Sequence, residues 1–215
     1  MRPIKLIISA FGPYPECETI DFEKLGNKGL YLITGDTGAG KTTIFDAITY
    51  VLYGKSSGKT RSSSMLRSKY AKPDVPTFVK MEFEYRNKKY VIERNPEYER
   101  PKIHGEGTTT QGANATLIYP DKDTPVTGSS NVTVAINELI GLDYEQFTQI
   151  AMIAQNDFLK LLLADTDERR KIFSKIFNTY PYEKLQLKLG DEAKRLRRLV
   201  DDQNKSISQY IDGIR

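Results

Sequence analysis

Cysteine and histidine are nearly absent from this sequence of 215 residues. The single cysteine, Cys17, excludes a disulfide framework and a cysteine-based zinc site built from this chain alone. The single histidine, His104, excludes an internal histidine cluster and argues against a Ser-His-Asp triad. Any chemistry of this chain therefore has to come from other residue types.

Long apolar runs and a strong charge imbalance are also missing. No run approaches the ~18 residues of a membrane span, and Met1 leads directly into strand-like sequence with no signal peptide. We therefore expect a cytoplasmic protein with no membrane partner. Thirty-two Lys and Arg against 28 Asp and Glu give a net charge of +4. A balance this mild permits nucleic-acid binding without arguing for it.

The hydrophobic pattern predicts an α/β fold of ordinary domain size, with an extension. Strands are expected at residues 4–8, 19–22, 29–34, 79–85 and 89–93, with a hairpin turn at 86–88 and the strand 29–34 buried. An irregular sheet extension is expected over 96–131, with its best strand at 115–119. Helices are expected at 44–52, 132–141, 146–152 and 169–177, the first of them ending at Gly54.

The C-terminal tail is the most periodic segment. Its apolar seam advances in steps of three and four residues from Tyr182 to Ile214, with charged residues between. This pattern predicts the beginning of a coiled coil. An ordinary amphipathic helix packed on the domain is the alternative. We expect two domains, residues 1–180 and 181–215.

The strongest motif is a complete G-x-x-x-x-G-K-[ST] sequence, placed between a predicted strand and a predicted helix. Glycines let successive backbone N–H groups turn toward an anion, and the helix directs its positive dipole end to the same place. Lys41 then reaches the β- and γ-phosphates, and the Thr42 hydroxyl ligates Mg²⁺. The alternative is a glycine-rich turn that binds nothing. The predicted nucleotide-binding residues are Gly35, Asp36, Thr37, Gly38, Ala39, Gly40, Lys41, Thr42 and Thr43.

A catalytic acid is harder to find. Hydrolysis needs a carboxylate at a strand end to hold the Mg²⁺ shell, and only two weak candidates exist, Asp121 after 117–120 and Asp143 after 139–142. Proline interrupts the first of these stretches and glycine the second. Gln155 follows the apolar stretch 150–154, where an amide can complete the Mg²⁺ sphere or orient water. Taken alone, a glutamine is more often a surface residue.

Residues 55–72 form a polar loop with six basic residues and no acidic ones. Contact with phosphate, of DNA or of nucleotide, and a solvated flexible loop are both open interpretations. The candidate contacts are Lys55, Lys59, Arg61, Arg67, Lys69 and Lys72.

Six stretches together are similar to one family. They are residues 10–14 (AFGPY), 20–22 (IDF), 35–48 (GDTGAGKTTIFDAI), 66–68 (LRS), 96–101 (PEYERP) and 149–158 (QIAMIAQNDF). In this order they resemble the N-terminal segment of the SbcC family, the ATPase subunits of bacterial SbcCD nucleases, which are related to SMC proteins. The resemblance covers nearly the whole chain.

The resemblance implies lobe I of an ABC-type ATPase head, with a mixed sheet, an antiparallel β extension and the start of a coiled-coil helix. It implies that Lys41 and Gln155 are catalytic, Gln155 as the Q-loop residue that contacts the metal together with Thr42. ATP and Mg²⁺ are the implied cofactors. The signature motif and the Walker B acid would come from the C-terminal half of the same ATPase. This fragment alone is expected to be inactive without that half.

The resemblance also implies partners. ATP would lie between two heads, one from each of two copies, and head engagement would control an SbcD-like, metal-dependent nuclease on double-stranded DNA ends. The implied processes are DNA repair, recombination and replication, in the cytoplasm at the nucleoid. Two other hypotheses remain, a self-contained P-loop kinase or GTPase and a structural coiled-coil protein with a vestigial P-loop. Neither a kinase lid nor an Asn-Lys-x-Asp motif is evident in the sequence.

Overall fold

The computed structural model describes residues 1–26, 31–56, 65–102, 105–151, 165–166, 174 and 179–214. The chain divides into two compact units, Met1–Met152 and Ile153–Arg215. Each unit is described by itself. The predicted boundary between residues 180 and 181 stays a prediction.

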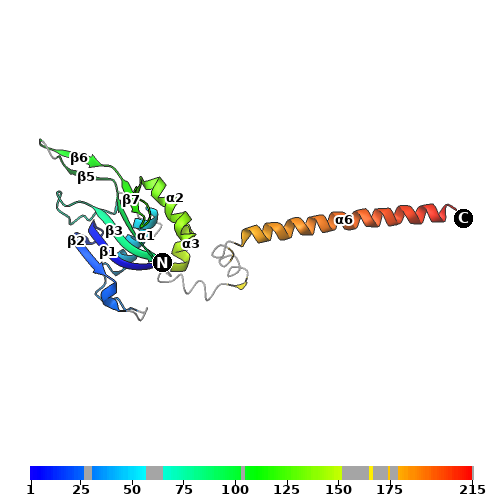
Figure 1. Cartoon of the computed structure of the whole chain (residues 1–215), viewed down its shortest axis with the longest axis horizontal. Helices are drawn as coiled ribbons and strands as arrows, with labels where there is room; N and C mark the ends of the chain where they lie inside the picture. The colour runs from blue at the N-terminus through cyan, green and yellow to red at the C-terminus, as the bar shows by residue number, and fades with distance from the viewer. Residues whose placement is uncertain are drawn as a thin grey trace. The chain divides into compact units, whose positions relative to one another are not determined.

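The first unit is built on a six-stranded sheet with the strand order β2-β1-β3-β4-β7-β8 (Figure 1). Every pairing between its neighbouring strands is antiparallel. The α/β class is confirmed, but the described strands show no parallel pairing of the kind that a mixed sheet contains. The strands are β1 (Arg2–Phe11), β2 (Tyr14–Asp21), β3 (Phe78–Tyr85), β4 (Lys88–Asn95), β7 (Asn114–Ile118) and β8 (Val126–Thr127).

The hairpin between β3 and β4 forms where the alternation of the sequence predicted it. Tyr85 pairs with Lys88, so the loop has only two residues, Arg86 and Asn87. Both have positive φ angles, 51° and 60°. Such a turn matches the right-handed twist of the flanking strands, which fixes the register of β3 against β4.

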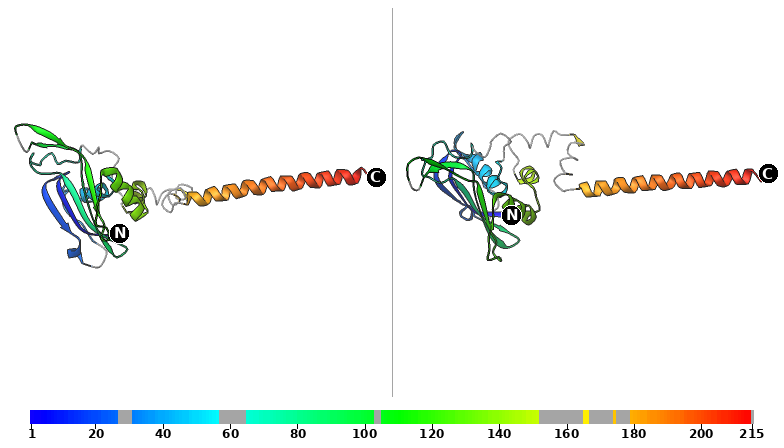
Figure 2. Two further views of the ribbon diagram at one scale, coloured as in Figure 1. Left: turned by 45° about the horizontal axis from the view of Figure 1, so that its top comes forward. Right: turned by 90° about the horizontal axis from the view of Figure 1, so that it is seen from above.

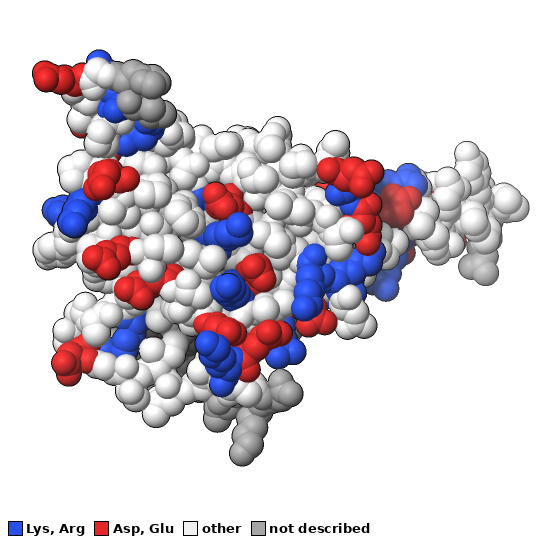
Figure 3. All heavy atoms as spheres, turned by 60° about the vertical axis from the view of Figure 1, so that its left-hand side comes forward, with Lys and Arg blue, Asp and Glu red and all other residues white. Residues whose placement is uncertain are grey.

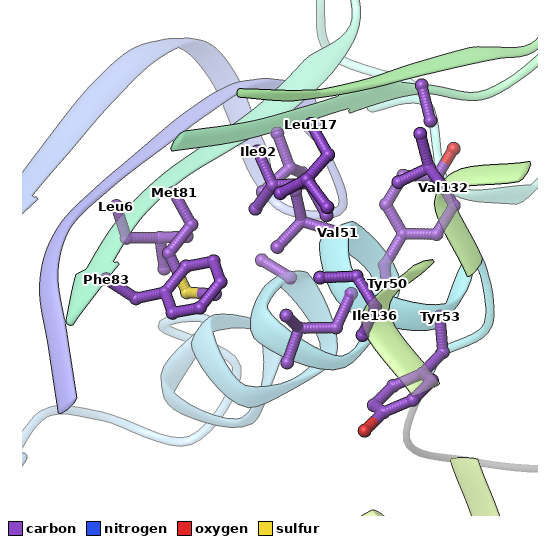
Figure 4. Packing of buried hydrophobic residues seen from close by; sticks show 14 of the residues in the cluster. Leu6, Tyr50, Val51, Tyr53, Met81, Phe83, Ile92, Leu117, Val132 and Ile136 are labelled. Carbon is purple, nitrogen blue, oxygen red and sulfur yellow. The ribbon is translucent and has the colours of Figure 1, made fainter. Parts of the chain in front are cut away.

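Three helices cover one face of this sheet (Figure 1). They are α1 (Lys41–Tyr53), α2 (Ser129–Ile140) and α3 (Tyr144–Ala151). The core lies between α1, α2 and the sheet, where Val51 and Ile136 meet Met81, Ile92 and Leu117 (Figure 4). All five side chains are fully buried. The period-two pattern of the strands and the helical period of α1 therefore supply the two sides of one core.

The C-terminal end of α1 is closed by a buried arginine. Gly54 ends the helix with a φ of 74°, and its N–H donates to the Tyr50 carbonyl at 2.7 Å. Arg94 on β4 is 3% exposed. Its Nε donates to the Val51 carbonyl at 3.1 Å and its Nη2 to the Leu52 carbonyl at 3.3 Å. The guanidinium thus takes up helix-end carbonyls that have no partner inside the helix.

Arg94 also reaches α2. It donates to the Ser129 carbonyl at 3.3 Å and to Thr133 Oγ1 at 3.1 Å. Burial lowers the pKa of Arg94, and the neighbouring Tyr50 opposes this shift. An arginine nevertheless stays charged in a protein, so a positive charge lies at the negative end of the α1 dipole.

The opposite face of the sheet carries charges of both signs (Figure 3). Lys5 lies between Asp21 and Glu82 in the strand register, and Lys80 lies opposite Glu93. The Lys80 and Glu93 side chains are 3.5 Å apart. Cross-strand pairs of opposite charge suit a face that contacts water.

The extension predicted over 96–131 contains a small separate sheet of β5 (Tyr98–Pro101) and β6 (Thr108–Gln111). It projects beyond the large sheet (Figure 2). Arg100 Nε donates to Gln111 Oε1 at 3.0 Å across this pair. The predicted strand 115–119 corresponds to β7, which belongs to the large sheet instead.

The buried strand predicted at 29–34 is wrong for its described part. Residues 31–34 form no strand, and Leu32 is 87% exposed. A strand needs a neighbouring strand for its backbone hydrogen bonds, and none of the described strands pairs with this segment. Apolar, β-branched sequence alone therefore does not make a buried strand here.

In the second unit, α6 (Tyr180–Asp212) confirms the long helix predicted from Tyr182. None of its residues is buried. The apolar seam is exposed at Leu185, Leu189, Leu196, Val200 and Ile207. The coiled coil itself stays a prediction. The helix predicted at 169–177 and Gln155 lie outside the described residues.

Across the described residues, no helix is both long enough and apolar enough to span a membrane.

Candidate functional site

The glycine-rich loop is an exposed turn that leads directly into α1. Gly38 and Gly40 have φ angles of 90° and 88°, a region that side chains with a Cβ atom rarely enter. The Ala39 N–H donates to the Asp36 carbonyl at 3.2 Å and closes the turn. Residues 35–39 are exposed. The loop is therefore curled as the motif requires and open to a ligand.

Lys41 lies across this loop. Its Nζ donates to the Gly35 carbonyl at 2.6 Å and to the Asp36 carbonyl at 2.7 Å. These bonds hold the ammonium group over the mouth of the loop. A phosphate oxygen offers the same ammonium a charged acceptor, which forms the stronger hydrogen bond.

The N-terminal end of α1 has no cap from a side chain. Gly40 is the N-cap residue, and the first turn contains no acidic residue. The free N–H groups and the positive dipole end at this position favour an anion. Within the described ranges, no side chain competes for that place as an anion would.

The two threonines after Lys41 differ in a way that the motif does not reveal. Thr42 is exposed at the start of the helix, whereas Thr43 is buried. The Thr43 N–H donates to the Gly40 carbonyl at 2.9 Å. The Thr42 hydroxyl is therefore the more accessible of the two.

Both candidate acids from the sequence have structural partners. Asp143 Oδ1 accepts the Gln146 N–H at 2.8 Å, and Gln146 Oε1 accepts the Asp143 N–H at 3.0 Å. This reciprocal pair caps the N-terminal end of α3. Asp121 forms an ion pair with Lys88. In the described part of the chain, no group of three or more His, Cys, Asp or Glu residues is placed to hold a metal ion.

The basic loop is only partly described, because Lys59 and Arg61 lie outside the described residues. Lys69 and Lys72 are exposed, and Lys55 Nζ lies 5.1 Å from the centre of the Tyr144 ring. Arg67 is engaged within the protein, since it donates to the Val75 carbonyl at 2.8 Å and to the Lys72 carbonyl at 2.9 Å.

Arg67 also lies over the Tyr98 ring, 4.9 Å from its centre. These contacts give Arg67 a structural role that the charge pattern did not predict. They leave Lys69 and Lys72 as the freer basic groups.

One contact at this site is not predictable from the sequence. The Tyr14 hydroxyl, in the turn between β1 and β2, donates to the Gly40 carbonyl at 3.1 Å. In sequence, residues 10–14 indicate only a turn and part of a family resemblance. Twenty-six positions separate the two residues, so no local pattern indicates the contact.

A glycine loop that curls beneath a lysine at the start of a helix defines the class of P-loop nucleotide-binding proteins. A family model described as "AAA domain" matches residues 5–215. The chain belongs to this AAA-domain family, and nucleotide binding follows from that membership.

Individual relatives are consistent with the family resemblance. The chain is 41% identical over 216 residues to the SbcC subunit of nuclease SbcCD from Vibrio cholerae serotype O1, covering 99% of this chain and 21% of the relative. It is 36% identical over 212 residues to the protein of the same name from Staphylococcus saprophyticus subsp. saprophyticus, covering 98% and 21%. A third, from Lactococcus lactis subsp. lactis, is 40% identical over 186 residues, covering 84% and 18%.

The resemblance to SbcC proteins is thereby confirmed. The chain spans about a fifth of the length of the curated relatives that it matches.

Proposed function

We propose that this chain is the ATP-binding part of an SbcC-type ATPase subunit of a DNA nuclease complex. The observation that carries the proposal is the exposed loop over Lys41 at the uncapped start of α1. The matches to SbcC proteins of SbcCD nucleases direct the choice among P-loop functions. They favour this function over a self-contained kinase or GTPase.

ATP binding begins with the exchange of the two Lys41 bonds for bonds to phosphate oxygens. The backbone N–H groups at the start of α1 then take up the remaining phosphate charge. Residues 35–43 form the binding loop, with Thr43 supporting it from its buried position. The exposed loop and the acid-free first turn of α1 fit a polyanion.

The described residues also fit Mg²⁺ as an ion that enters with the nucleotide. They offer the exposed Thr42 hydroxyl and no cluster of carboxylates. Mg²⁺ is commonly held by few protein ligands together with substrate phosphates. When bound, Mg²⁺ neutralises charge on the β- and γ-phosphates. We propose Thr42 as one ligand and Gln155 as the second.

Hydrolysis is proposed to need residues beyond those described. Asp121 and Asp143 are engaged in an ion pair and a helix cap, which leaves neither free as the catalytic acid. Lys41 and Gln155 are proposed catalytic residues of this chain. The acid and the signature motif are proposed to come from the C-terminal half of the ATPase and from a second copy.

The partners follow from the relatives. An SbcD-like nuclease subunit and double-stranded DNA are proposed because the relatives are named as one subunit of SbcCD nucleases. Lys69 and Lys72 are exposed and acid-free in their immediate sequence, so they are the leading DNA-contact candidates of this loop. Lys55, Lys59, Arg61 and Arg67 complete the proposed set. DNA affinity should fall steeply with salt, and less steeply after Lys69 and Lys72 are changed to alanine.

The test of nucleotide binding is a titration of the chain with fluorescent ATP in the presence of Mg²⁺. Lys41→Ala should weaken binding by about 100-fold, because a charge-assisted contact to the phosphates is lost. Lys24→Ala is the matched control, since Lys24 is an exposed lysine that pairs only loosely with Asp21, at 3.9 Å. Equal binding by the wild type and Lys41→Ala would contradict the proposal.

Hydrolysis is tested separately. The chain alone should show no turnover above background, and addition of the C-terminal half of an SbcC-type ATPase should restore it. Robust turnover by the chain alone would overturn the proposed division of the active site.

A further inference from the structure

We propose that the turn between β1 and β2, residues 10–14, orients the phosphate loop, and that Tyr14 is its positioning residue. This inference rests on the proposed ATP-binding function. It concerns how the loop is held ready, which neither the motif nor the relatives' names address.

The turn and the loop fit together through two glycines, one on each side. A Cβ atom on Gly40 would lie 2.8 Å from Pro13 Cγ and 2.8 Å from the Tyr14 hydroxyl oxygen. A Cβ atom on Gly12 would lie 2.8 Å from Thr43 Cγ2. Both glycines have positive φ angles, 57° at Gly12 and 88° at Gly40. Each element therefore leaves room for a side chain of the other.

The turn is itself firmly held. The Gly12 N–H donates to the Leu66 carbonyl at 2.8 Å, and the Ser68 N–H donates to the Ala10 carbonyl at 2.8 Å. Phe11 is buried, and its ring centre lies 5.5 Å from that of Tyr50 on α1. A turn fixed on both sides can impose its geometry on an exposed loop.

Ala10 has a φ of 45°, and the β1–β2 register shifts between Ser9 and Phe11. Such conformations are costly for a residue with a Cβ atom and persist where the surroundings enforce them. This strained position leads directly into the turn that contacts the phosphate loop.

The consequence for the ligand follows from peptide geometry. The Gly40 carbonyl accepts two hydrogen bonds, from the Tyr14 hydroxyl at 3.1 Å and from the Thr43 N–H at 2.9 Å. In a planar trans peptide, the N–H group points opposite to the carbonyl. Fixing the Gly40 carbonyl toward Tyr14 therefore fixes the Lys41 N–H in the opposite direction, away from the turn. That N–H group is one of the free donors at the start of α1.

The test compares Tyr14→Phe with Tyr53→Phe in the 215-residue chain. Both changes remove one hydroxyl and keep the ring. Tyr53 donates to the Leu142 carbonyl at 3.1 Å, the same distance as the Tyr14 bond, but at the other end of α1. Three quantities are measured for each variant: the dissociation constant of fluorescent ATP with Mg²⁺, the melting temperature without nucleotide, and the backbone amide resonance of Lys41.

Tyr14→Phe should weaken ATP binding by about five-fold, the effect of one neutral hydrogen bond. It should also shift the Lys41 amide resonance before any nucleotide is added. Tyr53→Phe should change neither, while its melting temperature changes at least as much as that of Tyr14→Phe.

Unchanged ATP affinity and an unchanged Lys41 resonance in Tyr14→Phe would overturn the inference while leaving nucleotide binding intact. Equal loss of affinity in both variants would assign Tyr14 a merely structural role and would also overturn it. Failure of the wild-type chain to bind ATP would instead contradict the proposed function on which the inference rests.

Discussion

The two ends of helix α1 are treated in opposite ways. At the C-terminal end, Arg94 satisfies the Val51 and Leu52 carbonyls inside the protein. At the N-terminal end, the helix starts at a glycine without a side-chain cap, beside an exposed loop. Since the two ends of a helix carry opposite partial charges, this chain supplies its own cation at one end. It leaves the other end for an external anion.

The difference separates stability from binding along one helix. Changes at the C-terminal end should lower the free energy of unfolding and spare nucleotide affinity. Changes at the N-terminal end should do the reverse. The predictions below test that division, from the largest expected effect to the smallest.

Replacing Arg94 should have the largest effect. Arg94→Met should lower the free energy of unfolding by about 3 kcal/mol, because it leaves buried carbonyls of α1 and α2 without donors. Urea unfolding measures the change. Arg86→Met is the control, since Arg86 is an exposed arginine in the β3–β4 turn. A loss below about 0.5 kcal/mol in Arg94→Met would show that Arg94 does not hold the two helices.

The glycines that flank α1 give a paired test. Gly54→Ala should lower the free energy of unfolding by about 2 kcal/mol, because the residue has a φ of 74° and its Cβ atom would lie 2.9 Å from Arg94 Nη1. Gly40→Ala should strain the phosphate loop in the same way and weaken ATP binding as well. Urea unfolding and ATP titration of both variants measure the contrast. Loss of ATP affinity in Gly54→Ala at a temperature where it is folded would break the division.

High pH probes the buried end of the helix. Burial raises the pKa of Tyr50, and the neighbouring Arg94 only partly opposes the shift. The folded protein therefore keeps a proton that the unfolded chain releases near pH 10. Stability should be intact below about pH 10 and fall above it, by up to about 1.4 kcal/mol per pH unit from this residue. Urea unfolding between pH 8 and pH 11 measures the slope.

Tyr50→Phe should reduce that slope. Tyr70→Phe, which changes an exposed tyrosine, should leave it unchanged. Equal slopes in the wild type and Tyr50→Phe would contradict the assignment of this effect to Tyr50.

The α3 cap should give the smallest effect. Asp143→Ala should lower the free energy of unfolding by about 1 kcal/mol, the usual value of an N-cap side chain. It should not change ATP affinity, because Asp143 caps α3. A loss of nucleotide binding comparable to that of Lys41→Ala would make Asp143 a candidate acid again.

Local patterns predicted the parts of the fold that depend on local chemistry. The motif at residues 35–42 placed the phosphate loop, and Gly54 marked the end of α1. The alternation around Met81 predicted β3 and its hairpin with β4. Each of these features is determined by residues that lie close together in sequence.

Features that depend on distant partners escaped prediction. The apolar segment 31–34 has the sequence of a buried strand, but strand formation depends on a neighbour. Arg94 has the sequence position of a polar strand end, and only the fold brings it to the end of α1. Asp143 is a candidate catalytic acid by sequence, whereas its bonds with Gln146 make it a helix cap. In each case the partner chosen by the side chain or the strand decided its role.

The most direct test of the account is the melting temperature of three proteins, each with and without saturating ATP and Mg²⁺. ATP should raise the melting temperature of the wild type and, by a similar amount, of the less stable Arg94→Met. Lys41→Ala should melt near the wild-type temperature without ATP and gain nothing from it. If Lys41→Ala gained as much as the wild type, the start of α1 would not be the nucleotide site. The central claim would then be wrong.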